Sequence, residues 1–440
     1  MNPEHRAIRP NYPLVGTPYR GAARRTVCVV RIVQAYPFVN IPSHEGIVTT
    51  AQSSARRLLL LGAVAYASTP ALPAQADVPV LRANSRALII RDGRSVVVGQ
   101  VEPDARPDVY RVTYPRTTST VTYVSDIDSI TFSVKPGESK DFVILLEGKI
   151  ACPNRISAVA AFNTPRVLSG DTSAVQVIPF TLRDNRIYVR GTINGSAPLL
   201  MQFDLGASGS VINETSTARI PMTFDARDVL VNSDGTHGTR ASSANVLTIG
   251  NLQWSRERFA QTRNMSSWED VIIGNSLFRD FVVEIDYNKR ALLLHRERPP
   301  IPSTFVKLEK AMDNGVRPLV QAELRVKNEV FTDWYLFDTG QSGTLIIGNQ
   351  QNHRHDLRRK TGAWFGIGGR KLTRVRGFRL AGMELPPTMA TIETLSKAEG
   401  GLRYSLLGNG WLKHFNVVID NQHGHLYLAR IVTDTTTADR

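Results

Sequence analysis

The sequence contains very little cysteine. Its 440 residues include only Cys28 and Cys152. Two cysteines cannot build a disulfide framework or a cysteine-based zinc site. No histidine lies in a catalytic context near Cys152, so we interpret it as a small buried residue rather than a nucleophile. The sequence predicts neither a metal ion nor a cofactor.

Two other patterns of reactive residues are incomplete. A serine hydrolase needs a G-x-S-x-G turn, but in the two Asp-x-Gly segments the fifth positions of that pattern are Ser210 and Thr344. Two histidine pairs lack a third nearby ligand, so we interpret them as hairpin residues rather than metal ligands; they are His353-Arg354-His355 and His423-Gly424-His425.

The formal net charge of +14 is unevenly distributed. The segment 1–76 holds eight arginines, no lysine and two glutamates, a net of +6. No aromatic-interleaved basic stripe occurs in the remainder, so we expect no nucleic-acid partner. The basic groups at residues 354–360 and 370–379 are interpreted as solvated faces.

Residues 1–76 have the anatomy of an export leader. Arg56-Arg57 precede the apolar run Leu58–Ala67, and two prolines then lead to Ala74-Gln75-Ala76. This order predicts cleavage after Ala76 and a periplasmic or secreted protein. The run is shorter than the roughly 20 residues that span a bilayer, so we expect no stable membrane insertion. Residues 1–53 fit no signal peptide, which favours a translation start downstream of Met1.

Residues 77–172 read as a β-sandwich accessory module. Runs rich in β-branched residues recur without helical periodicity, and Asp92-Gly93-Arg94 is a hairpin signal. We expect strands at 87–91, 95–101, 108–114, 119–125, 129–134 and 141–147. Asp126 and Asp128 are interpreted as solvated carboxylates. No reaction chemistry converges here, so the module is predicted to be structural or to serve docking.

The rest of the chain is a duplication in which equivalent positions differ in number by a constant 134. Phe203-Asp204-Leu205-Gly206 corresponds to Phe337-Asp338-Thr339-Gly340. Downstream, Ile272-Ile273-Gly274 corresponds to Leu406-Leu407-Gly408. Each copy therefore offers one Asp-x-Gly turn after an apolar strand. A duplicated unit of this kind can build a two-carboxylate site on a pseudo-twofold axis.

The paired turns have a chemical consequence. An apolar strand that ends in Asp204 or Asp338 delivers a carboxylate at a sheet edge, and Gly206 and Gly340 let the backbone fold tightly beside it. Two such carboxylates that meet cannot both ionise easily, so they share one proton. The ionised partner can take a proton from water while the protonated partner polarises a carbonyl.

These residues resemble the retropepsin-like aspartic proteases, in a fused two-repeat form with a pepsin-like bilobal plan. The resemblance implies an all-β fold with lobe 1 at 173–300, lobe 2 at 301–430 and a tail at 431–440. It implies a monomer with an internal pseudo-twofold, and a peptide or protein substrate in a cleft between the lobes. Asp204 and Asp338 take the catalytic positions. The supporting residues are Gly206, Ser208, Thr339, Gly340, Ser342, Gly274 and Gly408. Flap candidates are Asn232–Thr239 and Gly366–Lys371.

One position departs from the family pattern. The family has Thr or Ser after each Asp, where the hydroxyl crosses to the other lobe; Thr339 fits and Leu205 does not. The prediction is an exported aspartic endopeptidase. The alternative is a catalytically impaired homologue that binds extended peptides by adding a strand. Two further alternatives remain: turn-forming Asp residues without catalysis, and an envelope-associated scaffold.

Overall fold

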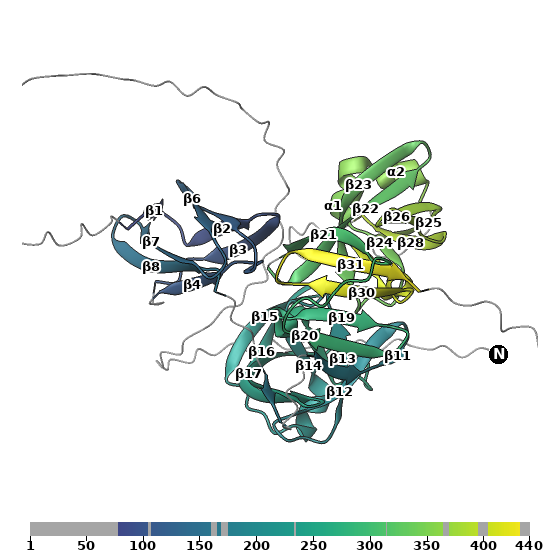
Figure 1. The fold of residues 1–440 in the computed structure, drawn as a ribbon, viewed down its shortest axis with the longest axis horizontal. Helices are drawn as coiled ribbons and strands as arrows, with labels where there is room; N and C mark the ends of the chain where they lie inside the picture. The colour runs from purple at the N-terminus through teal and green to yellow at the C-terminus, as the bar shows by residue number, and fades with distance from the viewer. Residues whose placement is uncertain are drawn as a thin grey trace, which may run out of the picture.

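The protein is described by a computed structural model over residues 78–103, 107–159, 165–168, 175–232, 235–313, 315–363, 369–394 and 404–431. The predicted leader and residues 432–440 of the tail lie outside these ranges. The architecture is all-β, as the sequence predicts (Figure 1). Within the described residues, no helix is long and apolar enough to cross a membrane.

The amino-terminal module consists of two small sheets packed face to face. One has the strand order β1-β7-β8-β4 and the other β3-β2-β5-β6. Tyr123, Phe142 and Ile144 are fully buried between them. The strands are β1 (Val80–Ala83), β2 (Ala87–Asp92), β3 (Ser95–Gln100), β4 (Asp108–Arg111), β5 (Ser119–Val124), β6 (Ser129–Val134), β7 (Ser139–Leu146) and β8 (Ile150–Ser157).

The six strands expected in the module are present, and β1 and β8 were not anticipated. β8 contains Pro153, which lies opposite Val143 of β7. Proline is normally excluded from paired strands, so the pattern gave no strand signal there. β1 is a four-residue edge strand. The backbone after it is held by Asp126, whose carboxylate accepts from the N–H of Asn84 at 2.9 Å.

Lobe 1 is built around a mixed sheet in which β13 and β18 run parallel, side by side. Its elements are β9 (Arg166–Val167), β10 (Val175–Pro179), β11 (Thr181–Arg183), β12 (Arg186–Ile193), β13 (Leu199–Asp204), β14 (Ser210–Asn213), η1 (Glu214–Arg219), β15 (Ala226–Asn232), β16 (Gly235–Ile249), β17 (Leu252–Thr262), β18 (Val271–Gly274), η2 (Asn275–Phe278), β19 (Val282–Asp286) and β20 (Ala291–His295). Strand β9 lies inside the bounds 77–172 predicted for the amino-terminal module but pairs with β17 of lobe 1.

Lobe 2 repeats this plan, with β23 beside β29 in place of β13 beside β18. The two short helices α1 and α2 stand where lobe 1 has η1. Its elements are β21 (Val306–Asp313), β22 (Arg317–Val326), β23 (Glu329–Asp338), β24 (Leu345–Ile347), α1 (Asn349–His355), α2 (Leu357–Thr361), β25 (Arg370–Val375), β26 (Gly377–Leu380), β27 (Met383–Glu384), β28 (Thr388–Glu393), β29 (Ser405–Gly408), α3 (Asn409–Leu412), β30 (Phe415–Asp420) and β31 (His425–Arg430).

A shared sheet joins the lobes, with strand order β10-β20-β19-β30-β31-β21. Val283 pairs with Ile419, and Ile285 pairs with Val417. Each of these pairs maps onto the other when the offset of 134 is applied, whereas the Glu284–Val418 pair maps onto itself. The pseudo-twofold axis therefore passes through this pair.

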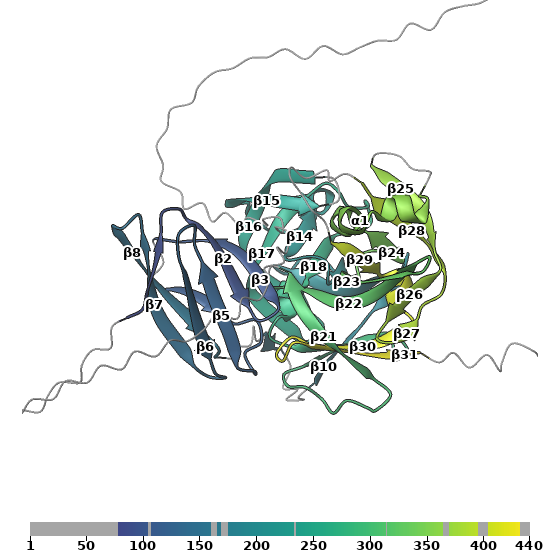
Figure 2. The ribbon, with the colours of Figure 1, turned by 90° about the horizontal axis from the view of Figure 1, so that it is seen from above.

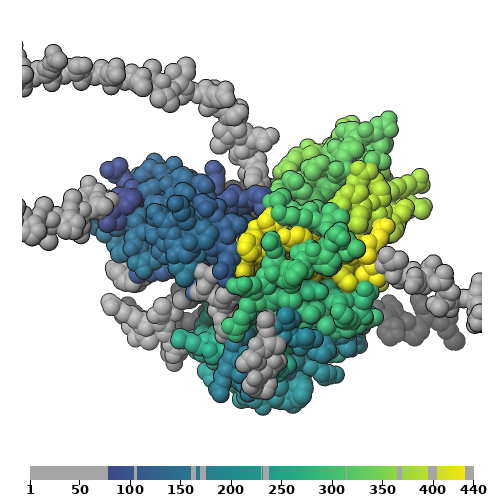
Figure 3. Space-filling model, in the orientation of Figure 1, coloured from purple at the N-terminus to yellow at the C-terminus, as the bar shows by residue number. Residues whose placement is uncertain are grey.

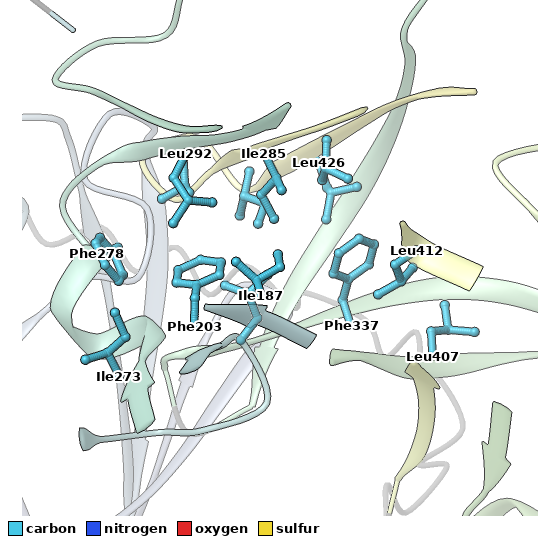
Figure 4. Packing of buried hydrophobic residues seen from close by; sticks show 14 of the residues in the cluster. Ile187, Phe203, Ile273, Phe278, Ile285, Leu292, Phe337, Leu407, Leu412 and Leu426 are labelled. Carbon is cyan, nitrogen blue, oxygen red and sulfur yellow. The ribbon is translucent and has the colours of Figure 1, made fainter. Parts of the chain in front are cut away.

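The interlobe sheet covers the strands that carry the two Asp turns. Figure 4 shows Phe203 and Phe337, the residues just before each Asp, beneath Leu292, Ile285 and Leu426 of this sheet. All five side chains are fully buried in one continuous cluster. Burial of an aromatic ring stabilises the fold by about 1.5–3 kcal/mol. A rigid apolar floor thus fixes the backbone from which both carboxylates project.

The amino-terminal module packs against lobe 2 at strand β21 (Figures 2 and 3). The Tyr114 hydroxyl donates to the Lys310 carbonyl at 2.7 Å, and the Ser95 hydroxyl accepts from the Met312 N–H at 3.1 Å. The Lys310 side chain is fully buried here, where its ammonium group donates to Asn421 Oδ1 at 2.9 Å. Burial lowers the pKa of Lys310 to about 7.

Candidate active site

Each Asp turn is held from behind by a neighbouring parallel strand. Asp204 at the end of β13 lies opposite Gly274 of β18, and Asp338 at the end of β23 lies opposite Gly408 of β29. A Cβ on Gly408 would stand 2.2 Å from the Gly343 carbonyl oxygen, so only glycine fits there. The correspondence at offset 134 thus reflects one local structure used twice.

The structure brings the two predicted carboxylates together. The carboxyl groups of Asp204 and Asp338 lie close enough to act on each other's pKa, and any hydrogen bond between them requires that one carry a proton. Each is also held by its own turn: the Gly206 N–H donates to Asp204 at 2.7 Å, and the Gly340 N–H donates to Asp338 at 2.9 Å. The Gln341 N–H adds a third bond, to Asp338, at 3.0 Å.

The glycines of the two turns make room for the carboxylate of the opposite lobe. A Cβ on Gly206 would lie 2.6 Å from the carboxyl carbon of Asp338, and one on Gly340 would lie 2.3 Å from that of Asp204. Real Cβ atoms do not approach other atoms so closely. Any side chain at either position would therefore separate the carboxylates. Gly206 and Gly340 are required by this close approach.

Burial raises the pKa of both carboxyl groups. Desolvation is the largest cause for Asp204; the Gly206 N–H, the hydrogen bond from Asp338, the Gly340 N–H and the charge of Arg186 oppose it. For Asp338, the charge of Asp204 adds to desolvation and lifts its pKa well above the ordinary value. The two carboxyl groups therefore titrate as a pair that shares one proton, and the charge of Arg186 favours the ionised form of Asp204.

The Thr339 side chain bridges the two Asp turns, and the twofold-related bridge is missing. The Thr339 hydroxyl accepts from the Leu205 N–H and donates to the Phe203 carbonyl, both at 3.0 Å. The offset maps these bonds onto the Thr339 N–H and the Phe337 carbonyl, which would need a hydroxyl at position 205. Leu205 has none, and it is fully buried in the core instead. The cross-lobe exchange is therefore made in one direction.

Sequence reasoning missed a group of residues at the β11–β12 turn. The Arg186 Nε donates to the Gly340 carbonyl at 2.8 Å, and the Asn185 amide donates to the Ser342 carbonyl at 2.9 Å. The Asn409 amide donates back to the Asn185 carbonyl at 2.6 Å. The Asn275 amide makes the matching bond to the Val316 carbonyl, also at 2.6 Å. These reciprocal bonds lock the two lobes on both sides of the carboxylates.

The remaining predicted residues have lesser roles. Ser342 contributes its backbone carbonyl, and Ser208 lies half-buried in the Asp204 turn. The first flap candidate lies on the β15–β16 hairpin, with Asn232 opposite Gly235. Half of the second, residues 366–368, lies outside the described residues, and the other half leads into and begins the edge strand β25.

The two histidine pairs lie in different elements. His423 lies in the β30–β31 turn, where its ring bonds the Asp420 carboxylate at 2.9 Å, and His425 begins β31. His353 and His355 lie on helix α1, so their interpretation as hairpin residues was wrong. In the part of the chain that the structure describes, no three His, Cys, Asp or Glu side chains form a cluster that could hold a metal ion.

Comparison with known proteins gives a fold-level result. No protein-family model matches the chain, and no curated protein matches it. Among solved structures, it is similar to the crystal structure of an aspartic proteinase from Irpex lacteus, with 14% identity and a TM-score of 0.42. The alignment covers 60% of this chain and 99% of that one. An overlap this loose carries no inference about activity, for which the local geometry of the two turns is the relevant observation.

Proposed function

We propose that the protein is an aspartic-type endopeptidase in which Asp204 and Asp338 activate water between them. The observation that carries this proposal is the close approach of two carboxyl groups from equivalent turns of a duplicated fold. Turn-forming Asp residues have no reason to meet across a pseudo-twofold axis. They would also not require glycine on both sides to let the opposite carboxylate approach.

We propose that Asp204 is the base and Asp338 the acid of the pair. Ionised Asp204 accepts a proton from the attacking water, since backbone N–H groups and Arg186 favour its charge. Protonated Asp338 donates a hydrogen bond to the scissile carbonyl oxygen. Water adds to the carbonyl carbon to give a tetrahedral diol. Transfer of a proton to the amide nitrogen then breaks the C–N bond and releases an amine and a carboxylic acid.

We further propose that the protein acts outside the cytoplasm as a monomer, on peptide or protein substrates. The leader pattern ending at Ala76 supports export. The internal pseudo-twofold supports the monomer, because one chain already supplies both carboxylates. Amino-terminal sequencing of the mature protein tests the export proposal: the expected first residue is Asp77, and an intact leader on a cytoplasmic protein would refute it.

Peptide hydrolysis by the purified protein is the direct test. A peptide library should be cleaved between pH 3 and 8, and a statine-type inhibitor should block cleavage. Asp204→Asn and Asp338→Asn should each abolish activity, since either change removes the shared proton or the base. Asp356→Asn is the matched control, because Asp356 is an exposed helix-end residue paired with Arg359. Activity that survives both dyad substitutions would overturn the proposal.

The missing hydroxyl at Leu205 favours one alternative, an impaired homologue that binds extended peptides. The Asp338 turn lacks half of the cross-lobe exchange, so its carboxyl could be held too loosely for turnover. The same library distinguishes the two functions. Retention of peptides by a folded protein without cleavage at any pH would favour binding.

A further inference from the structure

Arg186 occupies a bridging position that the duplication does not explain. It begins strand β12 directly after the Asp184-Asn185 turn, whose residues both have positive φ angles, 50° and 59°. This turn lies in lobe 1, yet the Arg186 Nε reaches the Gly340 carbonyl of lobe 2. Gly340 in turn packs against the Asp204 carboxyl. The guanidinium therefore contacts the backbone of one Asp turn and lies beside the carboxylate of the other.

A buried support in lobe 1 holds the guanidinium in place. The Arg186 Nη1 lies 3.8 Å from the Glu269 carboxylate, which is only 4% exposed. Glu269 accepts from the buried Tyr188 hydroxyl and from the Ser266 N–H. A carboxylate fixed in this way restricts the rotamers of its arginine partner. Arg186 is thus anchored at one end while it donates across the lobe interface at the other.

The equivalent residue of lobe 2 is arranged differently. Strand pairing makes Arg317 the counterpart of Arg186. In lobe 1, Ile187 lies opposite Phe203. In lobe 2, Leu319 lies opposite Leu336, so the same register sets Pro318 against Phe337, the equivalent of Phe203. Arg317 precedes Pro318 as Arg186 precedes Ile187. The Arg317 Nη2 pairs with Asp313 of its own lobe, and its buried Nε has no partner. The arginine bridge, like the threonine bridge, is therefore made in one direction. The two bridges run in opposite directions.

We propose that Arg186 is a positioning residue. Its hydrogen bond across the lobe interface holds the Asp338 turn, in place of the hydroxyl that position 205 lacks. Lobe 2 clamps the Asp204 turn through the Thr339 hydroxyl, and lobe 1 clamps the Asp338 turn through Arg186 at the Gly340 carbonyl. The guanidinium charge also favours the ionised form of Asp204 over that of Asp338. The inference rests on the proposed peptidase function for its kinetic consequence, but not for its effect on the titration of Asp204.

The charged and titratable groups around this bridge define what a pH experiment reports. Asp338 of β23 and Arg186 of β12 face Asp204. Glu269, before β18, faces Arg186 and is bonded by Tyr188. Lys413 of lobe 2 donates to Asn185 Oδ1 at 2.9 Å, next to Arg186. Removal of the guanidinium thus takes away a cation whose charge acts on Asp204.

Two substitutions separate geometry from charge. Arg186→Met loses both, so kcat should fall about 10- to 100-fold, the worth of a charge-assisted hydrogen bond. The acid limb of the pH profile should also move to higher pH, because ionised Asp204 loses its cation. Arg186→Lys keeps the charge without the Nε donor, so kcat should fall while the acid limb stays in place. Arg317→Met is the matched control and should leave the acid limb in place.

Carboxyl-carbon NMR of Asp-labelled protein supplies a readout independent of turnover, with Asp204→Asn used to assign the signal. The expected result is titration of Asp204 at higher pH in Arg186→Met than in the parent. An upward shift in a parent that shows no peptidase activity would sustain the positioning role and defeat the proposed function. An unchanged titration and acid limb in folded Arg186→Met would overturn the positioning role, whatever the activity of the parent.

Discussion

The Thr339 hydroxyl joins the lobes through two buried bonds, and Thr339→Val removes both without changing side-chain size. The substitution replaces an oxygen with a methyl group at a fully buried position. It leaves the Leu205 N–H and the Phe203 carbonyl without the partner that each has at 3.0 Å. Water cannot readily replace the hydroxyl, because Leu205 and Phe203 are themselves fully buried.

The expected loss of stability follows from the two orphaned groups. A buried backbone group left without a partner costs about 1–3 kcal/mol, so the free energy of unfolding should fall by about 2–6 kcal/mol. The Asp204 turn should also become less well positioned, since these bonds hold the residues on either side of Asp204. We therefore expect a lower kcat with a smaller change in KM.

Urea unfolding and peptide hydrolysis, measured on the same preparations, test this reasoning. Thr339→Ser keeps the hydroxyl and is the matched control; it should retain most of the activity and lose only the stability contributed by one methyl group, about 1 kcal/mol. If Thr339→Val keeps the stability and kcat of the parent, the two Thr339 hydrogen bonds do not hold the turns together.

Four other substitutions or measurements test further consequences of the structure. Leu205→Thr supplies the missing hydroxyl for Thr339 and Phe337, so kcat should rise about 2- to 12-fold, while the lost leucine packing lowers the melting temperature; a slower enzyme would contradict this. Asp338→Asn should raise the melting temperature at neutral pH, because the parent loses stability as pH rises through the raised pKa of Asp338; unchanged melting would contradict it. The pH profile of hydrolysis should be bell-shaped, with its acid limb above the ordinary Asp pKa of about 3.9, since burial raises the pKa of both Asp204 and Asp338; an acid limb below that value would count against the site. The lowered pKa of Lys310, about 7, makes the unfolded chain bind more protons between pH 7 and about 10.4, so stability should rise with pH over this window; melting curves of Lys310→Met should lack that rise.

The sequence predicted those parts of the site that keep a constant offset between the repeats. Asp204 and Asp338, their glycines and the strands ending at Gly274 and Gly408 all correspond at this offset. Each belongs to a local structure whose close contacts tolerate no insertion. Leu205 was also identified as an exception, because the corresponding position holds Thr339. These predictions depended on local backbone geometry, which a short motif can encode.

The arginine bridge could not be found in the same way. Arg186 and its counterpart Arg317 do not correspond at the constant offset. The β22–β23 hairpin of lobe 2 has longer strands than the β12–β13 hairpin of lobe 1, which shifts the numbering before it. A search at constant offset therefore passes over both. Even a correct alignment would show arginine in both repeats. It would not reveal that one crosses the interface and the other pairs with Asp313 of its own lobe.

The two one-way bridges bear on a general difficulty of symmetric carboxylate pairs. In a perfectly twofold site the shared proton has no preferred residence, and either carboxyl can act as base. Here the Asp204 side has the cation of Arg186 nearby and a turn held by Thr339, whereas on the Asp338 side Arg317 pairs with Asp313 and Leu205 has no hydroxyl. Loss of a hydroxyl at Leu205 thus removes one clamp and leaves a second, charged clamp that distinguishes the carboxylates. On this reasoning the departure at Leu205 breaks the symmetry of the pair while the turns that carry it stay in place.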